Sequence, residues 1–144
     1  MRQKTAVLSF ALIFMLTVLS GCKGGSDNAV LKDGTYSGMS SEDDKGAYGE
    51  ATVTVADGKI TDCEYVTWQK DGTVKDENYG KVNGDISNQD YYDKAQLAVK
   101  AMDQYAKQLV KVRKPEDVDA VSGATVSYDQ FREAVDDALD KARE

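Results

Sequence analysis

Two stretches of the chain carry apolar residues at helical spacing. From Tyr128 onward, apolar residues recur every three or four positions and form a single stripe. The stripe consists of Phe131, Ala134, Val135, Ala138, Leu139 and Ala142. Ser127 is followed three residues later by Gln130, which is the spacing of a capping box. The pattern therefore predicts a helix that starts at Ser127.

A second amphipathic pattern predicts a longer helix from Asp90 to Lys111. Its apolar side consists of Ala95, Ala98, Val99, Met102, Tyr105, Ala106 and Leu109. Pro115 follows shortly afterwards, and proline disfavours helical conformation in the residue before it. We therefore expect the helical segment to have ended before Pro115.

Upstream of both helices, apolar and polar residues alternate with a period of two, which is typical of half-buried strands. Strands are expected at Thr35–Ser37, Ala51–Val55 and Lys59–Trp68, and Asp57-Gly58 predicts a tight turn between the last two. The polar segment Gln69–Ser87 is interpreted as turns and loop. The sum is an α+β domain, a small antiparallel sheet covered by two helices.

The alternation is imperfect in the last of these strands. Ile60 falls on one face, whereas Cys63 and Tyr65 fall on the other. A β-bulge near Thr61 or Asp62 would bring all three side chains to the same face.

The N-terminus carries a targeting signal. Basic residues precede an apolar run from Ala6 to Leu19, which indicates a signal peptide over residues 1–21 that is too short for a stable membrane span. Leu19-Ser20-Gly21-Cys22 resembles a bacterial lipobox, in which Cys22 would receive a diacylglycerol and acyl chains such as palmitate. A signal peptide with a chance cysteine is the alternative. We expect residues 22–31 to form a lipidated flexible tether and residues 32–144 to form the domain.

Charge and composition narrow the possible functions. The 144-residue chain has a net charge of −7, and removing Arg2 and Lys4 with the signal peptide gives −7 − 2 = −9. Such a balance argues against nucleic acid and against adhesion to anionic lipid, so the lipid on Cys22 would be the membrane link, on the outer, extracytoplasmic face of the cell membrane. The chain has no histidine, which removes Ser–His and Cys–His catalysis and the commonest metal ligand. We assign no catalytic residue and no metal site.

Two further features have simple interpretations. If Cys22 is acylated, Cys63 has no intramolecular partner, and we interpret it as a small buried residue, with a reactive thiol as the alternative. Ser40–Gly46 contains three acids in a row, and we interpret it as a solvated hairpin loop rather than a metal site.

A short loop rich in hydroxyl groups, Asp119 to Ser127, lies directly ahead of the last predicted helix. A helix start carries unpaired N–H groups and a partial positive charge, both of which favour a bound phosphate. Gly123 permits a tight bend, and a phosphoester on the Thr125 hydroxyl would lie near the positive end. From spacing alone, an ordinary turn into a helix remains the simpler interpretation.

The loop sequence Asp119-x-x-Ser122-Gly123-Ala124-Thr125 resembles the flavin acceptor motif of the FMN-binding domain family. The family includes the C subunit of sodium-translocating NADH:quinone reductase, the G subunit of the Rnf complex and small flavoproteins of extracellular electron transfer. Two upstream segments, Asp33-Gly34-Thr35-Tyr36 and Asp57-Gly58-Lys59-Ile60, resemble the opening strands of the same domain. Together the matches extend from Lys32 to Ala142.

The resemblance implies a cofactor, its attachment and a function. Thr125 would carry FMN through a phosphoester bond made by an FAD:protein FMN transferase that uses FAD and magnesium, with Asp119, Ser122, Gly123 and Ala124 as recognition residues. The protein would be a membrane-anchored electron carrier rather than an enzyme with its own substrate, supplied by a quinone- or NADH-linked membrane reductase. A module that binds FMN non-covalently and a structural envelope lipoprotein without a cofactor are the alternatives.

Several side chains are candidates for contact with the flavin ring. The aromatic candidates are Trp68, Tyr79, Tyr91, Tyr92 and Tyr128, of which Tyr128 is preferred because it sits beside the acceptor loop. Lys81 and Lys94 are candidates for stabilising the reduced, anionic ring.

Overall fold

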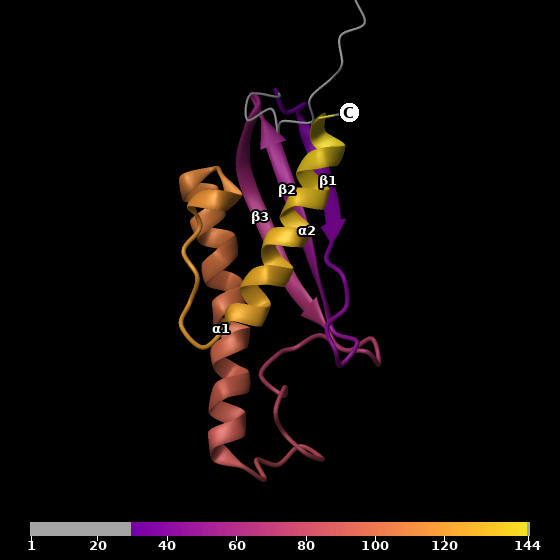
Figure 1. The fold of residues 1–144 in the computed structure, drawn as a ribbon, viewed down its shortest axis with the longest axis vertical. Coiled ribbons are helices and arrows are strands. Elements are labelled where there is room, and N and C mark those ends of the chain that lie inside the picture. Colours follow the sequence, from indigo (N-terminus) through magenta and orange to yellow (C-terminus); the bar gives the residue numbers. More distant parts are fainter. Residues whose placement is uncertain (1–29, 144) are drawn as a thin grey trace, which may run out of the picture.

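The computed structural model describes residues 30–143 and contains one antiparallel sheet and two long helices (Figure 1). The strands lie in the order β1-β2-β3. Their bounds are Gly34–Met39 for β1, Tyr48–Ala56 for β2 and Lys59–Trp68 for β3. Helix α1 spans Gln89–Val112, a short 3-10 turn η1 spans Pro115–Asp117, and α2 spans Thr125–Arg143. The predicted α+β fold, a small antiparallel sheet with two helices, is confirmed.

The predicted alternation of β2 fixes which face of the sheet is covered. Ala51, Val53 and Val55 are buried, while the intervening Thr52 and Thr54 are only partly covered. α2 packs against β1 and β2, and α1 packs against β3. One face of the sheet therefore supplies the core.

The turn and the bulge between β2 and β3 are both present. Asp57 and Gly58 have φ values of 52° and 69°, and two successive positive values suit a two-residue hairpin turn. Val55 pairs with Ile60 and Thr54 pairs with Asp62, so Thr61 has no opposite residue. The expected bulge near Thr61 or Asp62 is confirmed, and it turns Ile60, Cys63 and Tyr65 into the core.

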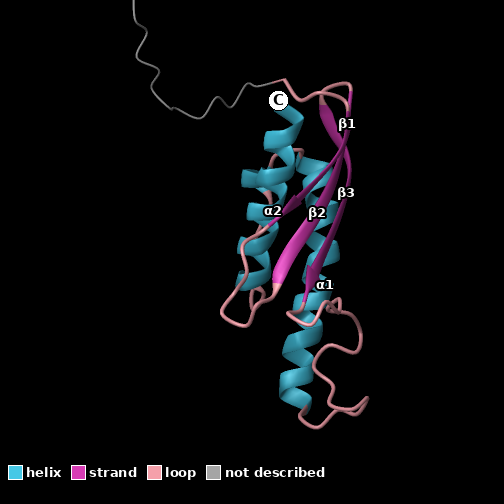
Figure 2. Ribbon diagram, turned by 90° about the vertical axis from the view of Figure 1, so that its right-hand side faces the viewer, coloured by secondary structure: helices cyan, strands magenta, loops and turns pink. Residues whose placement is uncertain are grey.

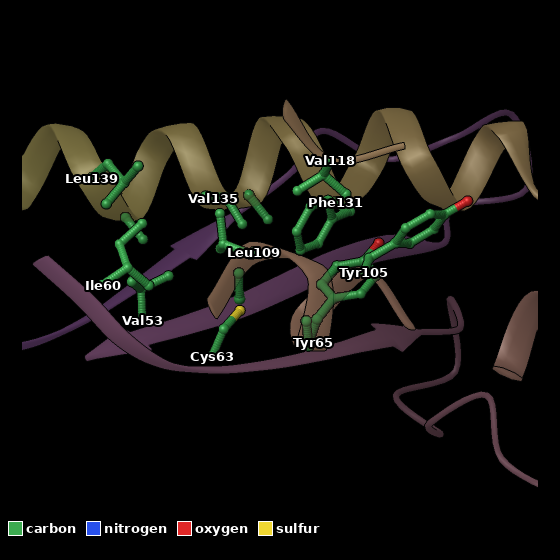
Figure 3. Packing of buried hydrophobic residues seen from close by; sticks show 14 of the residues in the cluster. Val53, Ile60, Cys63, Tyr65, Tyr105, Leu109, Val118, Phe131, Val135 and Leu139 are labelled. Carbon is green, nitrogen blue, oxygen red and sulfur yellow. The ribbon is translucent and has the colours of Figure 1, made fainter. Parts of the chain in front are cut away.

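Buried side chains of both helices meet the sheet in a single core (Figure 3). The ring of Phe131 lies 5.1 Å from that of Tyr65 and 5.4 Å from that of Tyr105, measured between centroids. All six residues of the stripe predicted for α2 are buried. Cys63 is also buried, and this burial raises the pKa of its thiol to about 12, so it is an inert core residue at neutral pH.

The sequence predicted the bounds of α1 correctly but not the start of α2. α1 agrees with the predicted Asp90–Lys111 to within one residue at each end. The predicted start of α2 at Ser127 is wrong, since the helix begins at Thr125. Ser127 and Gln130 form no capping box because α2 begins two residues before Ser127 and the Gln130 side chain bonds elsewhere. The Ser127 carbonyl accepts from the Tyr65 hydroxyl at 3.1 Å, and the Gln130 amide donates to the Ala47 carbonyl at 2.8 Å.

The two ends of the domain differ. The Lys32 N–H donates to the Ala142 carbonyl at 2.9 Å, so the described chain begins beside the C-terminal end of α2. At the opposite end, the first turns of α1 project beyond the sheet, with the 69–88 segment beside them (Figures 1 and 2). Within residues 30–143, neither helix has the length and apolar character needed to cross a membrane. The predicted signal peptide, Cys22 and residues 23–29 of the predicted tether lie outside the described residues.

Candidate cofactor site at the start of α2

The acceptor loop contains a tight β-turn over residues 121–124. The Ala124 N–H donates to the Val121 carbonyl at 3.0 Å, and Gly123 has a φ of 85°. A positive φ at the third residue is the requirement of a type II turn, and glycine meets it without strain. A Cβ at this position would also approach Leu97 of α1 to 2.8 Å. Gly123 therefore serves both the bend and the close contact with α1.

Thr125 is the first residue of α2 and is exposed. The first intrahelical bond runs from the Tyr128 N–H to the Ala124 carbonyl at 3.0 Å. Helix geometry leaves the N–H groups of Thr125, Val126 and Ser127 without intrahelical acceptors. A hydroxyl therefore stands at the positive end of a 19-residue helix, where an anion is favoured.

A cleft of about 470 Å³ opens at this helix start, which is within the range of small-molecule sites, roughly 300–1,000 Å³. One wall consists of residues 123–127 together with Ala98 of α1. The other wall comes from the loop residues 43–45 and from Lys75 and Tyr79. A second hollow of about 280 Å³ shares Lys75 and Tyr79 and extends toward the end of β3. The two hollows adjoin at shared lining residues that include Lys75 and Tyr79, and we refer to them together as the groove.

Lys75 is the cation most firmly placed in this groove. Its N–H donates to the Thr67 carbonyl at 2.9 Å, which ties its backbone to β3. Its ammonium lies 5.1 Å from the centroid of the Tyr79 ring, within cation–π range. Partial burial lowers the pKa of Lys75, while Asp43 opposes this shift and Lys45 adds to it. Among the ion pairs of residues 30–143, none includes Lys75, so an anion in the groove would meet an incompletely compensated charge.

Asp43 does not cancel this charge in a direct pair. Its carboxylate accepts the N–H groups of Lys45 and Ala47, each at 2.9 Å, and so shapes its own loop. The sequence predicts that the acids of residues 42–44 are solvated, and Glu42 and Asp44 are exposed while Asp43 is half-buried. Asp43 and Asp44 also line the cleft beside Lys45.

The five residues of the predicted acceptor motif divide into two groups. Gly123, Ala124 and Thr125 line the cleft. Asp119 and Ser122 are exposed and do not line it. The backbone of Asp119 is held by Gln108 of α1, which accepts its N–H at 3.0 Å and donates to its carbonyl at 3.3 Å, so the Asp119 carboxylate is presented to solvent.

The residues predicted to contact the flavin ring differ in whether they line the cleft. Tyr79 lines the cleft and Tyr91 lines the adjoining hollow, whereas Tyr92 lines neither. Trp68 and Lys81 line a neighbouring hollow beyond Tyr79. Lys94 lines none of these hollows.

Tyr128, the preferred candidate for the ring contact, does not line the cleft. Its hydroxyl donates to the Val118 carbonyl at 2.9 Å and its ring packs 5.5 Å from Tyr105, so it faces the core instead of the cleft. Sequence proximity to the acceptor loop does not place a side chain in the cleft, because successive helical residues point in different directions.

Sequence reasoning missed Lys45 and Lys75. Both lie in polar loops far from the acceptor motif, and only the path of those loops brings them to α2. No local pattern marks either lysine. The structure places Lys75 beside the end of β3, where the preceding Val74 forms an isolated antiparallel bridge with Trp68.

Fold and cleft together define a small α+β domain with a cleft at the start of α2. Lys45, Lys75 and Tyr79 line this cleft beside Asp43 and Asp44. The family model described as FMN-binding domain matches residues 46–140, about two thirds of the chain, and the chain belongs to this family. The family assigns FMN as the cofactor and makes the protein a flavin-binding protein.

Two solved structures are similar to this chain, and the first of them shares the fold. A crystal structure of the CPE2226 protein from Clostridium perfringens is 26% identical, with a TM-score of 0.62, and the match covers 78% of this chain and 88% of that one. A solution NMR structure of a protein from Clostridium thermocellum is 24% identical, with a TM-score of 0.46, and the match covers 79% and 94% of the two chains. No curated protein matches the sequence.

The residues of the groove fit FMN. The helix start and the lysines suit a phosphate, because they offer N–H groups and positive charge, although the Asp43 and Asp44 carboxylates of the same lining oppose a bound anion. Tyr79 and the apolar Ala98 offer surfaces suited to an aromatic ring. The exposed Thr125 hydroxyl lines the same cleft.

Proposed function

We propose that the protein is a lipid-anchored flavoprotein that carries FMN on Thr125 and transfers electrons on the extracytoplasmic face of the membrane. The observation that carries this proposal is the position of Thr125. It is the first residue of α2, it is exposed, and its cleft is lined by Lys45, Lys75 and Tyr79. These features give an esterified phosphate both N–H donors and cations.

Each group in the cleft has a separate role in this proposal. Thr125 supplies the oxygen of the phosphoester, and the N–H groups of the first turn of α2 bind the phosphate oxygens. Lys45 and Lys75 provide positive charge, and Tyr79 provides a face for the ring. When bound, the flavin supplies the redox chemistry, while the protein supplies attachment and electrostatics.

The two exposed motif residues suit a different partner. Asp119 and Ser122 lie outside the cleft lining, so we assign them to recognition by the FAD:protein FMN transferase. The membrane link in the proposal is the lipid on Cys22, and the electron donor is a quinone- or NADH-linked membrane reductase. An anchored carrier keeps a high local concentration of flavin at the membrane surface.

The acceptor assignment is tested by coexpressing the full chain with the transferase and measuring flavin fluorescence after denaturing electrophoresis. Wild-type protein is expected to keep its fluorescence, and Thr125→Ala is expected to lose it because no other hydroxyl takes its place. Ser127 is a poor substitute since it is buried.

Two further variants serve as controls in this experiment. Thr125→Ser retains a hydroxyl at the same position and is expected to be labelled. Ser87→Ala removes an exposed hydroxyl outside the acceptor loop and is expected to be labelled like wild type. Undiminished fluorescence in Thr125→Ala refutes the assignment. Flavin that is released from wild-type protein on denaturation favours the non-covalent alternative.

A second measurement tests the anchor. The intact mass of native protein should show both the lipid and the flavin, and Cys22→Ser should move the protein from the membrane fraction to the soluble one. A native N-terminus without lipid would contradict the anchor while leaving the flavin assignment intact.

A further inference from the structure

The hydroxyl of Tyr105 makes two hydrogen bonds to the acceptor loop. It accepts the Val121 N–H at 3.0 Å and donates to the Ala124 carbonyl at 3.2 Å. Tyr105 lies in α1 and is fully buried, and its ring packs against Phe131 in the core (Figure 3). The loop is therefore bonded to a side chain that cannot move without disturbing both helices.

These two bonds join the first and last residues of the β-turn. Val121 and Ala124 are also connected by the direct bond across the turn. The Tyr105 hydroxyl thus spans the base of the turn from the inside, and Ser122 and Gly123 remain on the exposed side. Thr125 follows Ala124 directly, so its backbone position depends on the Ala124 carbonyl that Tyr105 bonds.

We propose that Tyr105 is a positioning residue for the attachment of flavin to Thr125, an inference that rests on the proposed function. In that reaction the Thr125 Oγ1 forms a bond to the FMN phosphorus of FAD, and the phosphoanhydride bond breaks. AMP leaves with the bridging oxygen, the hydroxyl proton passes to a base of the transferase or to solvent, and no group is oxidised or reduced. Tyr105 takes part in none of these bonds.

Tyr105 acts by keeping the acceptor loop ordered before the transferase binds. A segment that is already ordered does not lose conformational freedom on binding, so the partner binds it more tightly. Replacing Tyr105 with Phe keeps the ring in the core and removes both bonds to the turn. The Val121 N–H and one acceptor position of the Ala124 carbonyl then lose their buried partner.

The test measures flavin attachment to the full chain with purified transferase, FAD and magnesium. For Tyr105→Phe we expect the KM for the chain to rise roughly tenfold with kcat little changed, the pattern of a lost contribution to binding. Amide exchange at Val121 should be slow in wild type and faster in the variant.

Two controls separate positioning from stability. Tyr36→Phe removes a hydroxyl that donates to the Lys32 and Asp33 carbonyls at the far end of the domain. Ile60→Val trims a fully buried core residue away from the loop. Both are expected to keep the wild-type KM.

The possible outcomes are distinct. A wild-type KM in Tyr105→Phe, or an equal rise in Ile60→Val at matched stability, overturns the positioning role. Fast Val121 exchange in wild type overturns it without any variant. If wild type accepts no flavin from an active transferase, the proposed function fails and the inference fails with it.

Discussion

Single residues determine whether the acceptor loop can take its shape, and Gly123 is the clearest case. We expect Gly123→Val to prevent flavin attachment while the fold is retained. The positive φ would cost about 1–3 kcal/mol in a residue with a side chain, and the added Cβ would displace Leu97. Intact mass measures attachment, and circular dichroism with denaturant titration measures the fold.

Gly72 provides the matched control. Its φ of 82° is similar, but nothing lies within 4 Å of an added Cβ. Gly72→Val should show the cost of strain alone and should retain attachment. Global unfolding of Gly123→Val, with Gly72→Val folded, would make Gly123 a residue of the fold rather than of the loop.

Lys75 is the residue whose charge should influence the bound flavin. Reduction adds negative charge to the ring, so a nearby cation favours the reduced form. We expect Lys75→Gln to lower the midpoint potential by tens of millivolts, since about 1.4 kcal/mol corresponds to ~30 mV for a two-electron couple. Spectroelectrochemistry of the loaded protein measures the shift.

Lys81 is a suitable comparison for Lys75. Its ammonium lies 5.8 Å from the Tyr92 ring, and it lines neither the cleft at Thr125 nor the hollow adjoining it. Lys81→Gln should leave the potential near that of wild type. Equal shifts in the two variants would indicate a general effect of net charge and would remove Lys75 from the site.

At the scale of elements, the sequence correctly predicted most features that depend only on which residues are buried. The stripe of α2 and the inward residues of β2 were correct because apolar periodicity is a direct consequence of packing one face. The start of α2 was misplaced by two residues because the Ala124 carbonyl already accepts the Tyr128 N–H and the Gln130 side chain bonds to the distant Ala47 instead of forming a cap. Local sequence carries no information about such partners.

The contact between β1 and α2 depends on a glycine that periodicity does not reveal. A Cβ at Gly38 would collide with the Ala134 carbonyl oxygen and the Ala138 nitrogen, so strand and helix backbones approach directly. We expect Gly38→Ala to destabilise the fold by about 1–3 kcal/mol or more, because backbone atoms cannot rotate away. Urea titration measures this loss.

The control for this variant is Ser37→Ala. Ser37 is the neighbouring residue of β1 and is exposed, so its side chain lies on the face of the sheet away from α2. A smaller loss of stability than in Gly38→Ala is expected. Similar losses in both variants would contradict a close approach of β1 and α2.

At the scale of the whole molecule, the two walls of the site differ in how far they could be foreseen. Gly123, Ala124 and Thr125 are consecutive, so one motif revealed them together. Lys75 and Tyr79 come from a loop whose path is set by its contact with α1, through bonds from Gln96 to the Asp76 and Tyr79 carbonyls. Such a wall exists only after folding, and a sequence pattern cannot place it.

The same arrangement separates the flavin site from the end where the chain would be tethered. Lys32 is bonded beside Ala142 at the C-terminal end of α2, and Thr125 is at its first residue. A 19-residue helix is roughly 28 Å long. If the lipid is on Cys22, the flavin should on average face away from the bilayer and exchange electrons more readily with soluble acceptors than with membrane quinone.

In vesicles, flavin fluorescence should therefore be quenched only weakly by spin-labelled lipid headgroups. Moving the attachment point to the opposite end, by Cys22→Ser with a lipid coupled to Ser87→Cys, should strengthen the quenching. Equal quenching with the two anchors would show that the tether permits all orientations.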